Sequence, residues 1–60
     1  MPSFITIDQA AERLGLHPRT VRRMICGGEL PAYRVGRFVR IDPDDLGSVV
    51  RPVVAGEVRP

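Results

Sequence analysis

The fold of this 60-residue chain is decided by residues 6–25, which read TIDQAAERLGLHPRTVRRMI. Thr6 is followed three residues later by Gln9, which predicts a capping box in which each side chain satisfies a backbone N–H of the other. Apolar side chains then recur at the helical spacing i, i+3, i+4 and i+7, as Ile7, Ala10, Ala11 and Leu14. A first helix is therefore expected to begin after Thr6.

A tight turn should separate this helix from a second one. Gly15 ends the first helix because glycine adopts a positive φ without steric cost, and Leu16 is expected to drop into the core from the turn. Pro18 suits the first position of a helix. The second helix should run from Pro18 to about Cys26, where two glycines end it.

The second helix has one apolar and one basic face. At 100° per residue the buried face is centred near Val21, so that Arg19 and Arg23 point away from the core, with Thr20 and Arg22 on the shoulders. Two short helices joined by a tight turn form a helix-turn-helix, whose second helix lies in the major groove of DNA. Arg19 and Arg23 are then expected to contact base edges, and Thr20 and Arg22 to hold phosphates.

His17 precedes the second helix and has two interpretations. The N–H groups at a helix N-terminus favour an anion, so His17 could contact a phosphate there. A turn histidine can equally serve as a simple helix cap. The sequence leaves both open.

Residues 33–41 alternate in the manner of two β-strands, and Gly36-Arg37 at the midpoint predicts a two-residue type II′ hairpin turn. One face is expected to carry Tyr33, Val35, Val39 and Ile41, and the other to carry Arg34, Phe38 and Arg40. Arg37 at the tip fits a narrow minor groove or its flanking phosphates, reinforced by Arg34 and Arg40. The alternative is a solvated hairpin that uses arginine for solubility. Phe38 has two interpretations, an exposed ring that wedges or stacks against sugar and a ring that covers the small core.

The segment Asp42-Pro43-Asp44-Asp45 combines an N-cap, a proline and carboxylates, which predicts the start of a third helix. Its apolar stripe should comprise Leu46, Val49 and Val50. The predicted fold is a small α+β winged helix-turn-helix, with two helices, a hairpin wing and a short third helix. We expect residues 1–51 to form this DNA-binding domain and residues 52–60 to form either a frayed tail or a partner-docking segment.

Charge is concentrated in the middle of the chain. All nine basic residues are arginines, and seven of them lie from Arg13 to Arg40 against a single acid, Glu29. A preference for arginine codons would explain the absence of lysine but not this clustering. The distribution indicates one face suited to a polyanion.

Other functions find little support. Cys26 is the only cysteine, so neither an intramolecular disulfide nor a zinc site with His17 is expected, and a reducing cytoplasm is the simplest location. The first five residues lack the features of a signal peptide, and no apolar run approaches the ~20 residues of a membrane span. The acids at 42–45 are explained by capping. We therefore expect no enzyme activity, metal, cofactor or small-molecule substrate.

Several segments carry a family resemblance. The spacing Ala11-x3-Gly15-x5-Val21 is similar to the general helix-turn-helix pattern, and residues 17–25, 28–37 and 40–46 resemble the small winged helix-turn-helix domain of excisionases and MerR-like proteins. The resemblance implies an excisionase, or recombination directionality factor. Several copies of such a protein bind direct repeats beside an attachment site, bend the DNA and help a tyrosine integrase, in the bacterial cytoplasm on the nucleoid.

Two other functions remain open on the sequence. A compact MerR-like transcriptional regulator would use the same fold. A small interaction module could instead present its basic face to an acidic protein. Arginines capable of bidentate contacts on both a helix and a wing favour nucleic acid over the interaction module.

Overall fold

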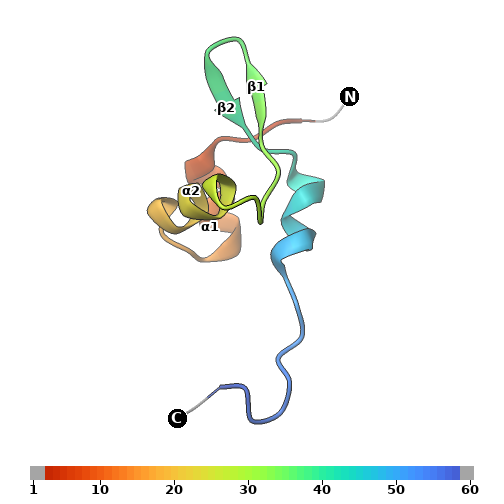
Figure 1. Ribbon diagram of the computed structural model, residues 1–60. Helices are drawn as coiled ribbons and strands as arrows, with labels where there is room; N and C mark the ends of the chain where they lie inside the picture. The colour runs from red at the N-terminus through yellow and green to blue at the C-terminus, as the bar shows by residue number, and fades with distance from the viewer. Residues whose placement is uncertain (1–2, 59–60) are drawn as a thin grey trace.

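The computed structural model describes residues 3–58 and confirms the winged helix-turn-helix α+β fold. In chain order the elements are α1 (Ile7–Leu14), α2 (Pro18–Cys26), β1 (Tyr33–Val35), β2 (Phe38–Arg40) and the 3₁₀ helix η1 (Pro43–Val49). α1 contacts both α2 and η1. The β1–β2 hairpin projects from this body as the wing (Figure 1).

α1 begins and ends where its sequence predicts. Thr6 Oγ1 accepts from the backbone N–H of Gln9 at 3.0 Å, and the Gln9 side chain accepts from the Thr6 N–H at 2.9 Å, which is the predicted capping box. Gly15 has φ 70° and ends the helix in the left-handed conformation.

The turn after α1 places Leu16 differently from the prediction. The Leu16 N–H donates to the oxygen of Ala11 at 2.9 Å, and the Gly15 N–H donates to the oxygen of Glu12 at 3.3 Å, which together form a Schellman motif. The Leu16 side chain is 39% exposed. It therefore stays exposed at the turn between the helices instead of entering the core.

α2 is capped at both ends by residues outside it. Nδ1 of His17 accepts from the backbone N–H of Arg19 at 3.1 Å, and Pro18 occupies the first helical position. At the other end Gly28 has φ 80°. The two glycines thus end α2 as predicted.

The hairpin has the predicted two-residue turn but not the predicted faces. Gly36 has φ 64° and Arg37 has a negative φ, as a type II′ turn requires. The opposed pairs are Tyr33 with Arg40, Arg34 with Val39, and Val35 with Phe38. Directly opposed residues in an antiparallel pair project to the same face. One face therefore carries Tyr33, Val35, Phe38 and Arg40, and the other carries Arg34 and Val39.

The third helix begins at its predicted cap, since Oδ1 of Asp42 accepts from the Asp44 N–H at 3.0 Å. It is a 3₁₀ helix, however, with three residues per turn. Leu46 is buried and Val49 half-buried, whereas Val50 is 65% exposed. The prediction that Val50 joins the apolar stripe is wrong because the stripe repeats every three residues and η1 ends at Val49.

The core is built from the three helices and from the segments that flank the wing, and no strand residue belongs to it. Its buried members are Ile5, Ala10, Ala11, Val21, Leu30, Ile41 and Leu46. Ile5 and Ile41 exchange two backbone N–H···O bonds, each of 2.8 Å, so the segment before α1 is joined to the chain just after β2. This bridge attaches the base of the wing to the helices.

Residues 50–58 follow η1 and are all exposed. The Glu57 N–H donates to the oxygen of Val54, and the Val54 N–H donates to the Glu57 carboxylate, both at 2.9 Å, which closes a local turn. This tail runs away from the helices and the wing (Figure 1). Among residues 3–58, no helix combines the length and apolarity needed to cross a membrane.

Candidate nucleic-acid interface

α2 presents a basic face to solvent. Val21 is fully buried, and the residues on the opposite face, Arg19, Arg22 and Arg23, are exposed, while Thr20 is half-buried. Burial of one face of a helix leaves residues about half a turn away pointing outward. The structure thus brings the four predicted residues of this helix onto one accessible surface, with Thr20 at its edge.

His17 stands at the N-terminal end of this surface and is exposed. Because Nδ1 accepts the capping hydrogen bond, the neutral imidazole carries its proton on Nε2. The first turn of α2 contains no acidic side chain to compensate the positive end of the helix dipole. His17 is therefore a cap, and its Nε2–H is also a donor suitable for an anion.

The loop of the wing, Gly36-Arg37, is exposed at the end of the hairpin. Arg34 is also exposed. Arg40 differs, because it is half-buried, its Nη1 donates to the oxygen of Val39 at 2.8 Å, and its Cζ lies 5.0 Å from the centroid of the Phe38 ring. Since Arg34 and Arg40 lie on opposite faces, they do not reinforce Arg37 from one shared face as predicted.

The hairpin face that carries Arg40 has a different composition from the predicted one. Val35 and Phe38, the pair that closes the loop, are 47% and 57% exposed and lie beside it. The two-residue turn could have predicted this face, because it forces residue 35 to pair with residue 38, and paired residues project to the same face. The structure excludes the alternative in which Phe38 covers the core.

The base of the wing is tied to η1 through a polar contact. Oη of Tyr33 donates to Oδ2 of Asp45 at 3.1 Å. This hydrogen bond, and then the negative charge of Asp45, raise the pKa of Tyr33 above its ordinary value. The Tyr33 ring lies against Phe4 with centroids 5.6 Å apart, and because both residues are exposed, Tyr33 lies outside the buried core.

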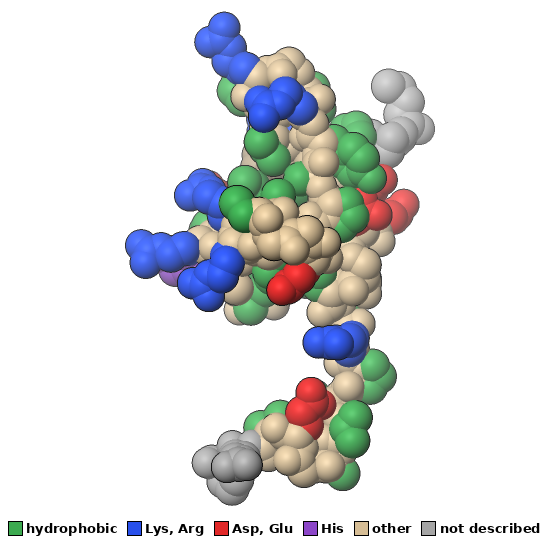
Figure 2. Space-filling view, in the orientation of Figure 1, with side chains coloured by type: hydrophobic (Ala, Val, Ile, Leu, Met, Phe, Trp, Pro, Cys, Tyr) green, Lys and Arg blue, Asp and Glu red, His purple; other side chains and the backbone are tan. Residues whose placement is uncertain are grey.

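Charge is divided between sides of the molecule. Figure 2 shows arginine side chains gathered on the side of the helix-turn-helix and at the end of the wing, with the histidine among them. One group of acidic side chains stands on the opposite side, where η1 carries Asp44 and Asp45 in its first turn. A polyanion is therefore attracted to the helix-turn-helix side and repelled from the η1 side.

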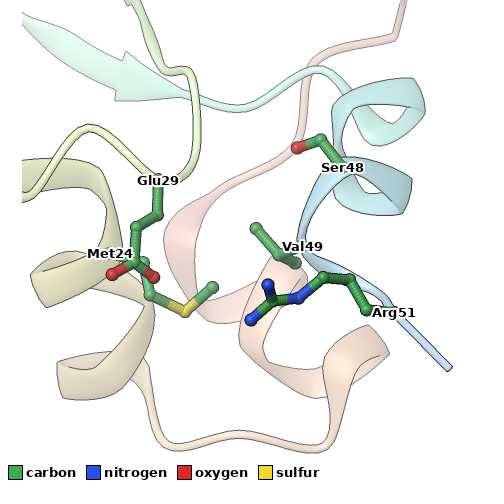
Figure 3. A pocket seen from close by; sticks show the side chains of 5 residues that line it. All are labelled: Met24, Glu29, Ser48, Val49 and Arg51. Atoms are coloured by element: carbon green, nitrogen blue, oxygen red, sulfur yellow. The ribbon is translucent and has the colours of Figure 1, made fainter. Parts of the chain in front are cut away.

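An open groove of 430 Å³ lies between the end of α2 and the end of η1. Figure 3 shows Glu29 and Arg51 approaching it from opposite sides, with Met24 and Val49 between them. It adjoins the core side of α2 and does not belong to the basic face. In residues 3–58 no group of His, Cys, Asp and Glu is arranged to hold a metal ion.

Comparisons with known proteins agree with this geometry. A family model described as a helix-turn-helix domain matches residues 4–48. An excisionase of Mycobacterium phage D29 is 41% identical over 54 residues, which make up 88% of this chain and 96% of that protein. The uncharacterized protein YvgK of Bacillus subtilis strain 168 is 48% identical over 44 residues, 73% of this chain but only 14% of that protein. The match to a helix-turn-helix domain and the 41% identity to a phage excisionase over nearly its full length place this chain in the excisionase family of DNA-binding helix-turn-helix proteins.

Proposed function

We propose that this protein is an excisionase that binds and bends attachment-site DNA and so assists a tyrosine integrase in excision. The observation that carries the proposal is the exposed arginine face of α2 next to an exposed, arginine-bearing wing. The similarity of this protein to the phage D29 excisionase supports the same role, since the match covers 96% of that excisionase. The protein would be architectural, with no cofactor or catalytic step of its own.

The contacts divide between bases and backbone. Arg19 and Arg23 at the centre of the exposed face are suited to bidentate contacts with guanine O6 and N7 in the major groove. His17, Thr20 and Arg22 lie around them and are suited to phosphates, which set the register of the helix. His17 reaches a phosphate through Nε2–H without giving up the cap at Nδ1.

The wing supplies a second set of contacts. Arg37 at the exposed tip is suited to the minor groove or its flanking phosphates, and the positive φ of Gly36 shapes the turn that presents it. Arg34 and Arg40 extend from opposite faces of the hairpin, so they would meet the two walls of the groove. A narrow minor groove has an enhanced negative potential that attracts such arginines.

Several copies are proposed to bind adjacent direct repeats on the nucleoid of a bacterial host. In this scheme residues 1–51 are the DNA-binding unit, and residues 52–60 dock on the integrase or a neighbouring copy; residues 1, 2, 59 and 60 lie outside the described part of the chain. The exposed valines of the tail support docking, with Val53, Val54 and Val58 between 65% and 70% exposed.

The test is a binding-site selection from the DNA of the source element, with footprinting of the enriched fragments at moderate salt. Direct repeats beside an attachment site and an integrase gene are the expected result. Adding the protein and that integrase to a circularisation assay should then raise the yield of excised circles. Inverted repeats over promoters would overturn the proposal in favour of a MerR-like regulator. Absence of any enriched sequence would favour a protein partner for the basic face.

A further inference from the structure

Phe38 and Arg40 form a defined pair on the wing. They lie two residues apart on β2, so their side chains project to the same face of the hairpin. The Arg40 Cζ atom is 5.0 Å from the centroid of the Phe38 ring, which is within the range of a cation–π contact. The 2.8 Å hydrogen bond from Arg40 Nη1 to the oxygen of Val39 holds the guanidinium from a second direction.

This pair leaves most of the guanidinium available. An arginine has five N–H donors in a fixed fork, and the bond to Val39 uses one of them. Phe38 is 57% exposed and does not belong to the buried core, so the ring makes little contribution to packing. The ring instead faces the Arg40 guanidinium, which it covers on one side.

The position of the pair indicates which part of DNA it meets. Arg37 lies in the loop at the tip, whereas Arg40 is the last residue of β2 and is paired with the first residue of β1. Arg40 therefore stands at the base of the wing. If the tip enters a groove, a residue at the base faces the sugar-phosphate backbone at the edge of that groove.

We propose that Phe38 is a positioning residue for DNA binding, whose ring holds Arg40 in the orientation that binds a backbone phosphate. The inference rests on the proposed function, because it requires the wing to meet DNA. A free arginine loses side-chain freedom when it binds a phosphate, and a guanidinium already held against a ring loses less. The side chain is thus ordered before the DNA arrives.

A double-mutant cycle on the full chain tests this coupling. The probes are a duplex with the selected site and a random duplex of the same length, and the variants are Phe38→Leu, Arg40→Gln and the double substitution. Phe38→Leu is expected to weaken binding to both duplexes by about two- to tenfold, because Arg40 must then be ordered on binding. Arg40→Gln removes the phosphate contact itself and is expected to weaken binding by at least as much. The double variant is expected to bind DNA no more weakly than Arg40→Gln alone, because Phe38 acts only through Arg40. Phe38→Tyr keeps the ring and should bind like the unsubstituted protein.

The salt dependence provides a second readout. Arg40→Gln should reduce the slope of log affinity against log salt by about 0.9, since it removes one phosphate contact. Thermal unfolding should change little for Phe38→Leu because the ring is exposed; if the melting temperature falls, Phe38→Met takes its place in the cycle. The inference would be overturned if the losses in binding free energy of the two single variants add in the double variant. It would also be overturned if Phe38→Leu binds DNA as tightly as the unsubstituted protein.

The two proposals fail in different ways. Coupling between Phe38 and Arg40 on random DNA, without preference for any site, would keep the positioning role and reject the excisionase function. Preference for direct repeats without coupling between Phe38 and Arg40 would support the excisionase function and reject the positioning role. Failure to bind any duplex would reject both.

Discussion

Tyr33 and Asp45 are joined by a 3.1 Å hydrogen bond from the phenolic Oη to Oδ2, which connects the first residue of β1 to η1. The bond spans twelve residues of sequence. Together with the bridge between Ile5 and Ile41, it fixes where the wing leaves the body of the domain. The orientation of the wing relative to α2 therefore depends on contacts made outside the hairpin.

The Tyr33–Asp45 contact predicts a loss of stability at alkaline pH. The pKa of Tyr33 is raised in the folded protein from its ordinary 10.0, so its contribution to stability is complete below that value and is lost as the pH rises through the folded pKa. Thermal unfolding followed by circular dichroism from neutral to strongly alkaline pH should show this decline. Tyr33→Phe should remove this part of the pH dependence of stability. The prediction would be contradicted if the variant and the unsubstituted protein lose stability equally at alkaline pH.

Arginines on α2 and on the wing are predicted to differ in sequence dependence. Arg19→Ala or Arg23→Ala should cost about 1 to 3 kcal/mol on the preferred site and less on random DNA, because a base contact is lost. Arg37→Ala should weaken binding to both about equally and flatten the salt dependence. With about 4 to 6 phosphates neutralised, log affinity should fall with log salt at a slope of about −4 to −5. Equal losses on both duplexes for all three variants would reject this division.

His17 is predicted to have two separable contributions. Asparagine is the better N-cap, so His17→Asn should raise the free energy of unfolding by a few tenths to about 1 kcal/mol. The same change removes the Nε2–H donor and should weaken DNA binding. Chemical denaturation and fluorescence anisotropy with labelled duplex measure the two effects. If binding is unchanged while stability rises, His17 is only a cap.

Gly15 is predicted to be required for its backbone conformation alone. Its φ of 70° is left-handed, and an added Cβ would meet no atom within 4 Å, so Gly15→Ala should cost roughly 1 to 2 kcal/mol of stability through backbone strain. Gly47→Ala is the matched control, since Gly47 is equally open but lacks a positive φ. Equal stability of the two variants would argue against a left-handed Gly15.

Val49 and Val50 test the geometry of η1. Val49→Ala should destabilise the domain by about 1 kcal/mol because it removes apolar contacts with the core, whereas Val50→Ala should stay within about 0.5 kcal/mol of the unsubstituted protein. Urea denaturation resolves this difference. Comparable losses at both positions would indicate an α-helical stripe that includes Val50.

The helices of the DNA-binding unit could be predicted because their determinants are local. The capping box of Thr6 and Gln9, the left-handed Gly15 and the proline at the start of α2 each act within a few residues of where they lie. The arginine face of α2 could also be predicted, because burial of Val21 determines which side chains of the same helix point outward. These parts of the candidate site were foreseeable from periodicity alone.

The faces of the wing were predicted wrongly although the turn was right. Alternation within each strand says which residues share a face of that strand, and only the pairing across the turn says how the two strands correspond. Val35 pairs with Phe38, so an aromatic ring and Arg40 share a face with the apolar residues of β1. The Phe38–Arg40 contact was missed for this reason.

By itself, the sequence determined the boundaries of α1 and α2, the start of the third helix, the two-residue turn and the basic face of α2, since these depend on interactions between residues a few positions apart. Only the tertiary structure decided that Leu16 stays exposed, that the third helix is 3₁₀ with Val50 exposed, and that Tyr33 forms a hydrogen bond with Asp45. These outcomes depend on which distant segments pack together. Ile5 and Ile41 exchange backbone hydrogen bonds across 36 positions of sequence, and neither has a local signal that identifies its partner.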